Sequence, residues 1–429
     1  MNSQYLFGLL LALSYVGMIA VFYSLEGAVG IAFVVVPFAV LVSLLYIVLI
    51  SGKNSFLSAV MVCGLIIKLF SAWLYTTLEA FKLADVHLYF DTAQQLATTS
   101  TRLDQLFMQP FWGTNFIISI GACLFAMIGP SLVGAMVLFA LVSFWGQYFF
   151  YRAFVLAFPT ANRNLAALLL FFCPSIVFWT AALGKDALML LAVSLISYGI
   201  ARRCDVKGWA AILVGLPLSS LIRPPIGALL AISLFISFLV TDVVRGRRAV
   251  GLKFMLFPIV LAASLAIVIY SRSSLELNNV EDARALSEHS YLYNQIGGSV
   301  FNADQSVQTR LAQAPLIMFR PFPWEANNVT AALASCESVL LFIFALSRRA
   351  GLSRLLANIR SAPLVAFTLC FFAAFSVVFS ISISNFGLLA RVRVMVLPLV
   401  LMLLVASASF VKRPKVSLRH LYRSQSSLS

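Results

Sequence analysis

Long apolar runs alternate with short polar connections along almost the whole chain. Most runs extend over about 17–25 residues, the length that an α-helix needs to cross a hydrocarbon core of about 30 Å. They lack the ten-residue alternation of a membrane β-barrel, so the pattern predicts an all-α, polytopic transmembrane bundle of about twelve helices, forming one membrane domain over residues 1–429. The predicted spans lie near residues 5–24, 29–50, 56–76, 131–155, 163–182, 186–201, 208–222, 224–241, 250–271, 330–347, 363–381 and 394–411.

Lysine and arginine gather in every second connection, and this alternation predicts an orientation. The positive-inside rule places the basic connections in the cytoplasm, and both chain ends with them. Two long connections then face outward, the first outer loop at 77–130 and the large outer loop at 272–329. Segment 114–129 is apolar but short, and counting it as a span would invert the loops on one side. We therefore predict a re-entrant or interfacial helix there.

Composition excludes a soluble globule, because 62% of the residues are hydrophobic and only 10% are charged. The net charge of +15 does not indicate nucleic-acid binding, since most of the basic residues sit in the short connections and set orientation. The six cysteines are scattered without a CxxC pair, so neither a disulfide framework nor a zinc site is predicted. No cofactor is expected, and the sequence leaves open whether a divalent metal assists; the N-terminal run is interpreted as a retained first helix.

The first outer loop carries the candidate catalytic residues Asp85, His87 and Asp91. A partly desolvated carboxylate at the membrane edge has a raised pKa and can accept a substrate proton, which suits a general base. On a helix, Asp85 shares a face with Tyr89 while Asp91 lies roughly opposite, so the two acids need not meet. The alternative is a solvated loop start with aromatic residues at the interface.

Three charges lie where apolar runs meet with almost no loop between them. Lys185 and Asp186 separate two predicted spans, and Arg223 stands before the pair Pro224-Pro225. Charges at this depth are costly unless they are paired or line a wet cavity, so they are candidates for binding a phosphate group. The alternatives are an ion pair that caps the next helix and an arginine that reaches toward lipid headgroups.

The large outer loop and the last outer connection supply further candidates for binding substrate or phosphate. A stiff run of Arg, Pro, aromatic and Glu residues near position 320 offers Trp for sugar stacking and Glu for hydroxyl groups, or alternatively an aromatic anchor at the interface. The candidates are Arg310, Arg320, Trp324, Glu325, Arg391 and Arg393.

Two more ionisable residues, Lys68 and Glu337, fall inside predicted spans. Charge buried in lipid is by default a functional-site hypothesis, although each group would also be explained by pairing across helices. Together with Arg223 they favour the alternative function, a transporter or flippase for a lipid-linked sugar or another anion. The gathering of polar groups on one side of the membrane favours an enzyme over this alternative.

Residues 80–200 resemble the C-type membrane glycosyltransferase superfamily and its surface-polysaccharide polymerase relatives. The motifs that carry the resemblance are Asp85 or Asp91, segment 114–129, Gly129-Pro130-Ser131, and Asp186 after the run Pro174 to Thr180. The resemblance implies sugar transfer from a polyprenyl-(pyro)phosphate donor to a glycan or lipid acceptor, at the outer face of a bacterial inner membrane. It further implies Asp85 or Asp91 as general base, cationic residues on the leaving phosphate, and polysaccharide-assembly proteins as partners.

Overall fold

The computed structural model describes residues 31–52, 54–77, 85–203, 205–241 and 307–411, and the single residues Pro258 and Ala262. Within these ranges the chain is helical and forms no β-strand, which confirms the predicted all-α class. The predicted span near 5–24, nearly all of the span near 250–271 and most of the large outer loop lie outside the described residues.

Four described helices are long and apolar enough to cross a membrane: α2 (Ala32–Ser51), α3 (Ser55–Thr77), α6 (Leu132–Ala157) and α17 (Pro363–Ser382). Two bent pairs bring the number to six if each pair is one span, namely α15 (Val329–Ser347) with α16 (Arg349–Ala357), bent by 63°, and residues 386–395 with 397–410, bent by 62°. These apolar helices indicate a membrane protein. The predicted bundle of twelve spans is not confirmed.

Four described apolar helices are shorter than a full span, namely α5 (Thr114–Ile128), α7 (Arg163–Phe172), α10 (Val206–Ile222) and α11 (Pro224–Val240). Helices α10 and α11 agree with the predicted spans 208–222 and 224–241 to within two residues, whereas α7 covers only the first half of the predicted span 163–182. A helix of 17 residues rises only about 25 Å, which is less than the hydrocarbon core. The predicted span 163–182 is broken at Cys173, because Pro174 has no N–H to continue the ladder and instead begins a short new helix, α8 (Pro174–Trp179).

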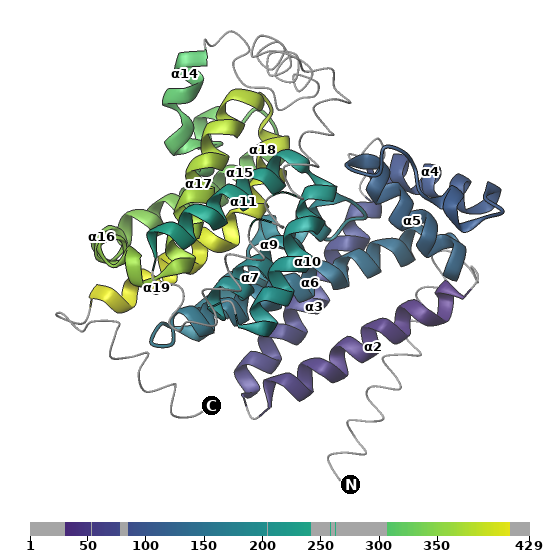
Figure 1. Cartoon of the computed structure of the whole chain (residues 1–429), viewed down its shortest axis with the longest axis horizontal. Helices are drawn as coiled ribbons and strands as arrows, with labels where there is room; N and C mark the ends of the chain where they lie inside the picture. Colours follow the sequence, from purple (N-terminus) through teal and green to yellow (C-terminus); the bar gives the residue numbers. More distant parts are fainter. Residues whose placement is uncertain are drawn as a thin grey trace. The chain divides into compact units, whose positions relative to one another are not determined.

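The contacts divide the chain into two compact units that interleave along the sequence. Unit 1 comprises residues 1–147, 171–191 and 221–223, and unit 2 comprises residues 148–170, 192–220 and 224–429. In unit 1, α2 packs against α3, α3 packs against α8, and α4 (Asp85–Thr99) packs along α5 (Figure 1). The 3₁₀ turn η2 (Leu103–Leu106) connects α4 to α5.

The first outer loop thus contains two packed helices in place of an irregular connection. A Cβ on Gly121 would lie 3.0 Å from the Cβ of Ala93, so α4 and α5 approach closely at their midpoints. The rings of Phe90 and Phe125 also pack edge to face, with centroids 5.2 Å apart. Helix α5 is 15 residues long and rises only about 22 Å. This length agrees with a helix that does not cross the bilayer, and its place at the interface stays a prediction.

In unit 2, α17 is the central apolar helix, and its Phe367, Phe371 and Phe375 are fully buried. Helix α11 packs along α17, and α16 packs along α19 (Leu397–Val411). A segment of short turns lies against α15 and α17. It consists of α14 (Val307–Ala312), η3 (Ala314–Phe319) and η4 (Pro323–Glu325). The remaining elements are η5 (Ile359–Ser361), α18 (Phe386–Val392) and η6 (Arg393–Met395).

Candidate functional site

An interrupted helix stands at the centre of the candidate site in unit 1. Helix α8 ends at Trp179 and α9 begins at Lys185 (Lys185–Ala201), and the five residues 180–184 form a break between the two helices. Irregular backbone inside an apolar bundle requires partners for its polar groups. Lys68 of α3 supplies one by donating from Nζ to the carbonyl oxygen of Ile176 at 3.1 Å and to the hydroxyl of Thr180. The break is therefore built into the packed bundle.

Helices α9 and α10 form a hairpin of equal arms, which brings their far ends together. Each arm has 17 residues, and glycines let the arms approach closely. A Cβ on Gly199 would lie 2.5 Å from the Gly208 carbonyl oxygen, and one on Gly215 would lie 2.6 Å from the Ala192 carbonyl oxygen. Residue numbers fall along one arm as they rise along the other, so the first residues of α9 and the residue after α10 come to the same level.

Asp186 and Arg223 meet at this level. Arg223 Nη2 donates to Asp186 Oδ1 at 2.7 Å, and the side chain of Arg223 is 18% exposed while that of Asp186 is 4% exposed. Lys185 donates from Nζ to the Thr114 hydroxyl at 2.9 Å, and the Gly113 N–H donates to the Leu221 carbonyl oxygen at 2.7 Å. We call Thr114, Lys185, Asp186 and Arg223 the 185–223 cluster. The sequence indicated three of these residues, and it gave no signal for Thr114.

The electrostatics of the 185–223 cluster favour an anionic ligand. Thr114 is the first residue of α5 and Lys185 is the first residue of α9. Helix N-termini carry partial positive charge and unsatisfied N–H groups, which suits them to phosphate and carboxylate. The cluster adds two cationic side chains and one carboxylate to these two helix ends. Arginine in particular offers a planar fork that matches a phosphate group.

The candidate catalytic residues of the first outer loop lie elsewhere in unit 1. Asp85 and Asp91 are exposed on α4, and His87 is half-buried there. Because α4 runs antiparallel to α5, Asp91 lies level with a point about ten residues along α5 from Thr114, which corresponds to about 15 Å. Asp85 and His87 lie farther still. Helix α4 therefore places Asp91 well away from the Thr114 end of α5.

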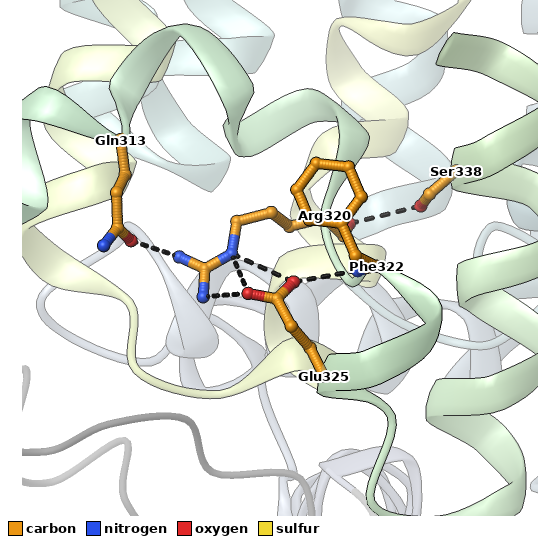
Figure 2. Close-up of polar contacts among 5 residues, drawn as sticks. All are labelled: Gln313, Arg320, Phe322, Glu325 and Ser338. Atoms are coloured by element: carbon orange, nitrogen blue, oxygen red, sulfur yellow. Dashed lines mark hydrogen bonds and ion pairs between the residues drawn. The ribbon is translucent and has the colours of Figure 1, made fainter. Parts of the chain in front are cut away.

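In unit 2, the side chain of Arg320 is held by protein groups (Figure 2). Its Nε and Nη2 both donate to the carboxylate of Glu325, with a shortest distance of 2.6 Å, and its Nη1 donates to Gln313. The Glu325 carboxylate also accepts the N–H of Phe322 at 2.8 Å, and the Ser338 hydroxyl donates to the Arg320 carbonyl oxygen. These contacts close the turn at residues 320–325, so the side chain of Arg320 stabilises this turn.

Arg393 is fully buried and holds the same turn through its hydrogen bonds. It donates to Glu337 at 3.0 Å, to the Ser338 hydroxyl at 2.7 Å and to the Arg320 carbonyl oxygen at 3.2 Å. Arg310 donates to the Ile381 carbonyl oxygen at 2.8 Å. Arg391 is half-buried on α18. The contacts of Arg310, Arg320 and Arg393 therefore favour a structural role over the expected phosphate clamp.

Trp324 is the most open of the predicted substrate-binding residues. Its ring stacks on Phe322 with centroids 4.9 Å apart and planes 10° apart, and the residue is 80% exposed. Glu325 beside it is engaged by Arg320, so the sugar-hydroxyl partner that the sequence suggested is already used as an acceptor. Among the residues that the structure describes, no group of three or more His, Cys, Asp and Glu residues gathers as a metal site would require.

The fold and the site together define an all-helical membrane protein with a cationic cluster beside a broken helix. Comparison with known proteins adds no relative, since no family model, no curated protein and no solved structure matches the chain.

Proposed function

We propose that the chain is a membrane glycosyltransferase that uses a polyprenyl-(pyro)phosphate sugar donor, with the 185–223 cluster holding the phosphate. The observation that carries the proposal is the meeting of Lys185, Arg223 and two helix N-termini at the ends of apolar helices. A lipid phosphate carries its charge near the ends of membrane helices while its tail stays in the bilayer. The resemblance of residues 80–200 to C-type glycosyltransferases supports the same donor class.

The base for the acceptor hydroxyl is assigned to Asp186. The acceptor oxygen must approach to within about 3–3.5 Å of the reacting carbon, which is bonded to the phosphate oxygen. Asp91, about 15 Å along α5 from Thr114, is too distant for this task. Asp186 already contacts Arg223 at 2.7 Å. A phosphate that takes over the fork of Arg223 releases the carboxylate of Asp186, which can then accept the proton of the acceptor hydroxyl.

The rest of the cluster stabilises the leaving group. Charge grows on the phosphate oxygen as the bond to the sugar breaks, and donors already aimed at that oxygen lower the barrier. Arg223, Lys185 and the N–H groups at the start of α9 are such donors. We place this chemistry at the outer face of a bacterial inner membrane, because the charge pattern puts residues 185 and 223 on the side opposite to the basic connections.

The test uses the full chain in lipid nanodiscs with undecaprenyl phosphate as the binding probe and a panel of undecaprenyl-phosphate sugars as donors. Arg223→Lys keeps the charge but loses the fork, so binding should weaken about tenfold or more. Asp186→Asn should retain binding and lower the release of undecaprenyl phosphate from donors by about 10²-fold or more. Arg152→Lys is the matched control, because Arg152 is exposed on α6.

Variants of the two acids of α4, Asp85 and Asp91, provide the outcome that would contradict the assignment of Asp186. Asp85→Asn and Asp91→Asn should leave donor turnover nearly unchanged. If either variant abolishes turnover while Asp186→Asn does not, the base stands on α4 and the assignment of Asp186 is wrong. If the wild-type chain neither binds undecaprenyl phosphate nor consumes any donor, the glycosyltransferase proposal itself is refuted.

One observation favours a second function, the transport or flipping of a lipid-linked sugar or another anion. Secondary transporters place substrates at discontinuous helices, where half-helix N-termini face anionic groups. The break at 180–184 has this arrangement, because Lys68 lies at the end of α8 and the 185–223 cluster lies at the start of α9. Movement of a fluorescent undecaprenyl-phosphate lipid between the leaflets of proteoliposomes, without donor turnover, would support transport over transfer.

A further inference from the structure

Lys68 is a fully buried lysine that the proposed reaction does not use. It lies in the middle of α3, among apolar residues, and is 0% exposed. Its Nζ donates to the Ile176 carbonyl oxygen at 3.1 Å and to the Thr180 hydroxyl. The Thr180 hydroxyl in turn donates to the same carbonyl oxygen at 2.6 Å. Among the described residues, the groups that accept hydrogen bonds from Lys68 Nζ are thus two neutral oxygens at the end of α8.

The position of these oxygens explains why a hydrogen-bond donor is present there. The last carbonyl groups of a helix lack intrahelical partners and carry partial negative charge. In an apolar bundle water does not satisfy them, so a helix that stops inside the bundle needs a donor from another element. The break after Trp179 creates this need, and the long side chain of Lys68 meets it from α3.

We infer that Lys68 is a positioning residue for the 185–223 cluster. By holding the end of α8, it fixes the start of the break at residues 180–184, and the other end of that break is Lys185, the first residue of α9. Lys68 therefore sets where Lys185 and Asp186 lie without touching the ligand. The inference rests on the proposed function for the identity of the ligand, and on the hydrogen bonds of Lys68 for the clamp itself.

The clamp is tested by hydrogen exchange of the full chain in nanodiscs, without any ligand. Lys68→Met keeps most of the side-chain volume and removes the donor. Amide exchange in peptides covering residues 176–187 should become at least about tenfold faster, because the end of α8 and the break lose their anchor. Lys207→Met, at an exposed lysine near the start of α10, is the control and should leave these peptides unchanged.

The effect on the cluster is tested by binding of undecaprenyl phosphate. Lys68→Met should weaken binding about tenfold, and Lys68→Ala should do the same in a way that added n-propylammonium reverses, since that cation replaces the deleted end of the side chain. Because Lys68→Met keeps most of the side-chain volume, weaker binding in Lys68→Met as well as in Lys68→Ala indicates the missing donor and not missing packing. If a Lys68 variant fails to fold, the same measurements are made on two variants of Thr180. Thr180→Val removes the hydroxyl acceptor of Lys68, whereas Thr180→Ser keeps it.

The outcomes separate this inference from the proposed function. Unchanged exchange in residues 176–187 of Lys68→Met, or of Thr180→Val relative to Thr180→Ser, overturns the clamp. Faster exchange with unchanged binding overturns the positioning role, provided that Arg223→Lys weakens binding. A wild-type chain that does not bind undecaprenyl phosphate refutes the proposed ligand and with it the positioning role, while the exchange result still decides the clamp.

Discussion

The buried ion pair of Arg393 and Glu337 should contribute more to the stability of unit 2 than any exposed pair. Arg393 is 0% exposed, and the side chain of Glu337 is 15% exposed. Removing one partner of a buried pair leaves the other charge uncompensated in a low-dielectric environment, which typically costs about 3–5 kcal/mol. Arg393→Met should therefore lower the free energy of unfolding by about that amount.

The contacts of Arg393 support the upper part of this range. The substitution removes the donor to Glu337 at 3.0 Å and also leaves the Ser338 hydroxyl and the Arg320 carbonyl oxygen without their guanidinium donor. Glu337→Gln should cost less, because an amide oxygen still accepts from Arg393 and the site is partly open to solvent. The double variant should cost less than the sum of the two single variants by about 1–3 kcal/mol.

Equilibrium unfolding in mixed micelles, followed as the mole fraction of a denaturing detergent rises, measures these differences. Arg354→Met is the matched control, because Arg354 is exposed and donates to the Phe410 carbonyl oxygen at 3.2 Å. It should change stability by less than about 0.5–1 kcal/mol. Additive effects of Arg393→Met and Glu337→Gln to within about 0.5 kcal/mol would refute the reasoning, since they would show that the two groups do not stabilise one another.

Three further outcomes are expected. Gly215→Ala should destabilise the α9–α10 hairpin by about 1–3 kcal/mol in the same unfolding assay, because its Cβ would lie 2.6 Å from a carbonyl oxygen of α9. Hydrogen bonds from Arg202 lower the pKa of Asp205 in the folded protein. The ionised Asp205 therefore stabilises the fold above its unfolded pKa of about 3.9, and this stabilisation is lost as the pH falls through the lower folded pKa. The difference in stability between wild type and Asp205→Asn should shrink below about pH 4. Reporter fusions at residues 205 and 355 should report the cytoplasm and a fusion at residue 95 the outer compartment, and a cytoplasmic signal at 95 would mean that α5 spans the membrane.

Composition and periodicity were sufficient to predict the helical class, but not the breaks in the helices. The sequence pattern treated residues 163–182 as one span, whereas Pro174 divides it and residues 180–184 unwind before α9. Hydropathy averages over such breaks, because apolar residues remain apolar whether or not the backbone is helical. The segment 85–99 shows the converse error, since its polar residues suggested a loop and yet its apolar positions pack a helix onto α5.

The residues of the candidate site were easier to find than their partners. Lys185, Asp186 and Arg223 could be chosen from the sequence because charges between apolar runs are rare and costly. Their pairing depends on the equal length of α9 and α10 and on the close approach at Gly199 and Gly215, which single-residue patterns do not reveal. Thr114 was missed because a hydroxyl at a helix start is usually interpreted as a cap.

The distribution of charge distinguishes the arginines that build the fold from the arginine proposed to bind a ligand. In unit 2, Arg320 faces Glu325 and Arg393 faces Glu337, so the guanidinium groups at the turn 320–325 are each paired with a carboxylate and the turn gains little net charge. In the 185–223 cluster, Arg223 pairs with Asp186 and Lys185 donates to the hydroxyl of Thr114, and Thr114 and Lys185 each begin a helix. The two cationic groups and the positive ends of the two helices suit a ligand with one or two negative charges. A phosphate group has that charge, and this is the physical reason for assigning the lipid-phosphate donor to this cluster and not to the arginines of unit 2.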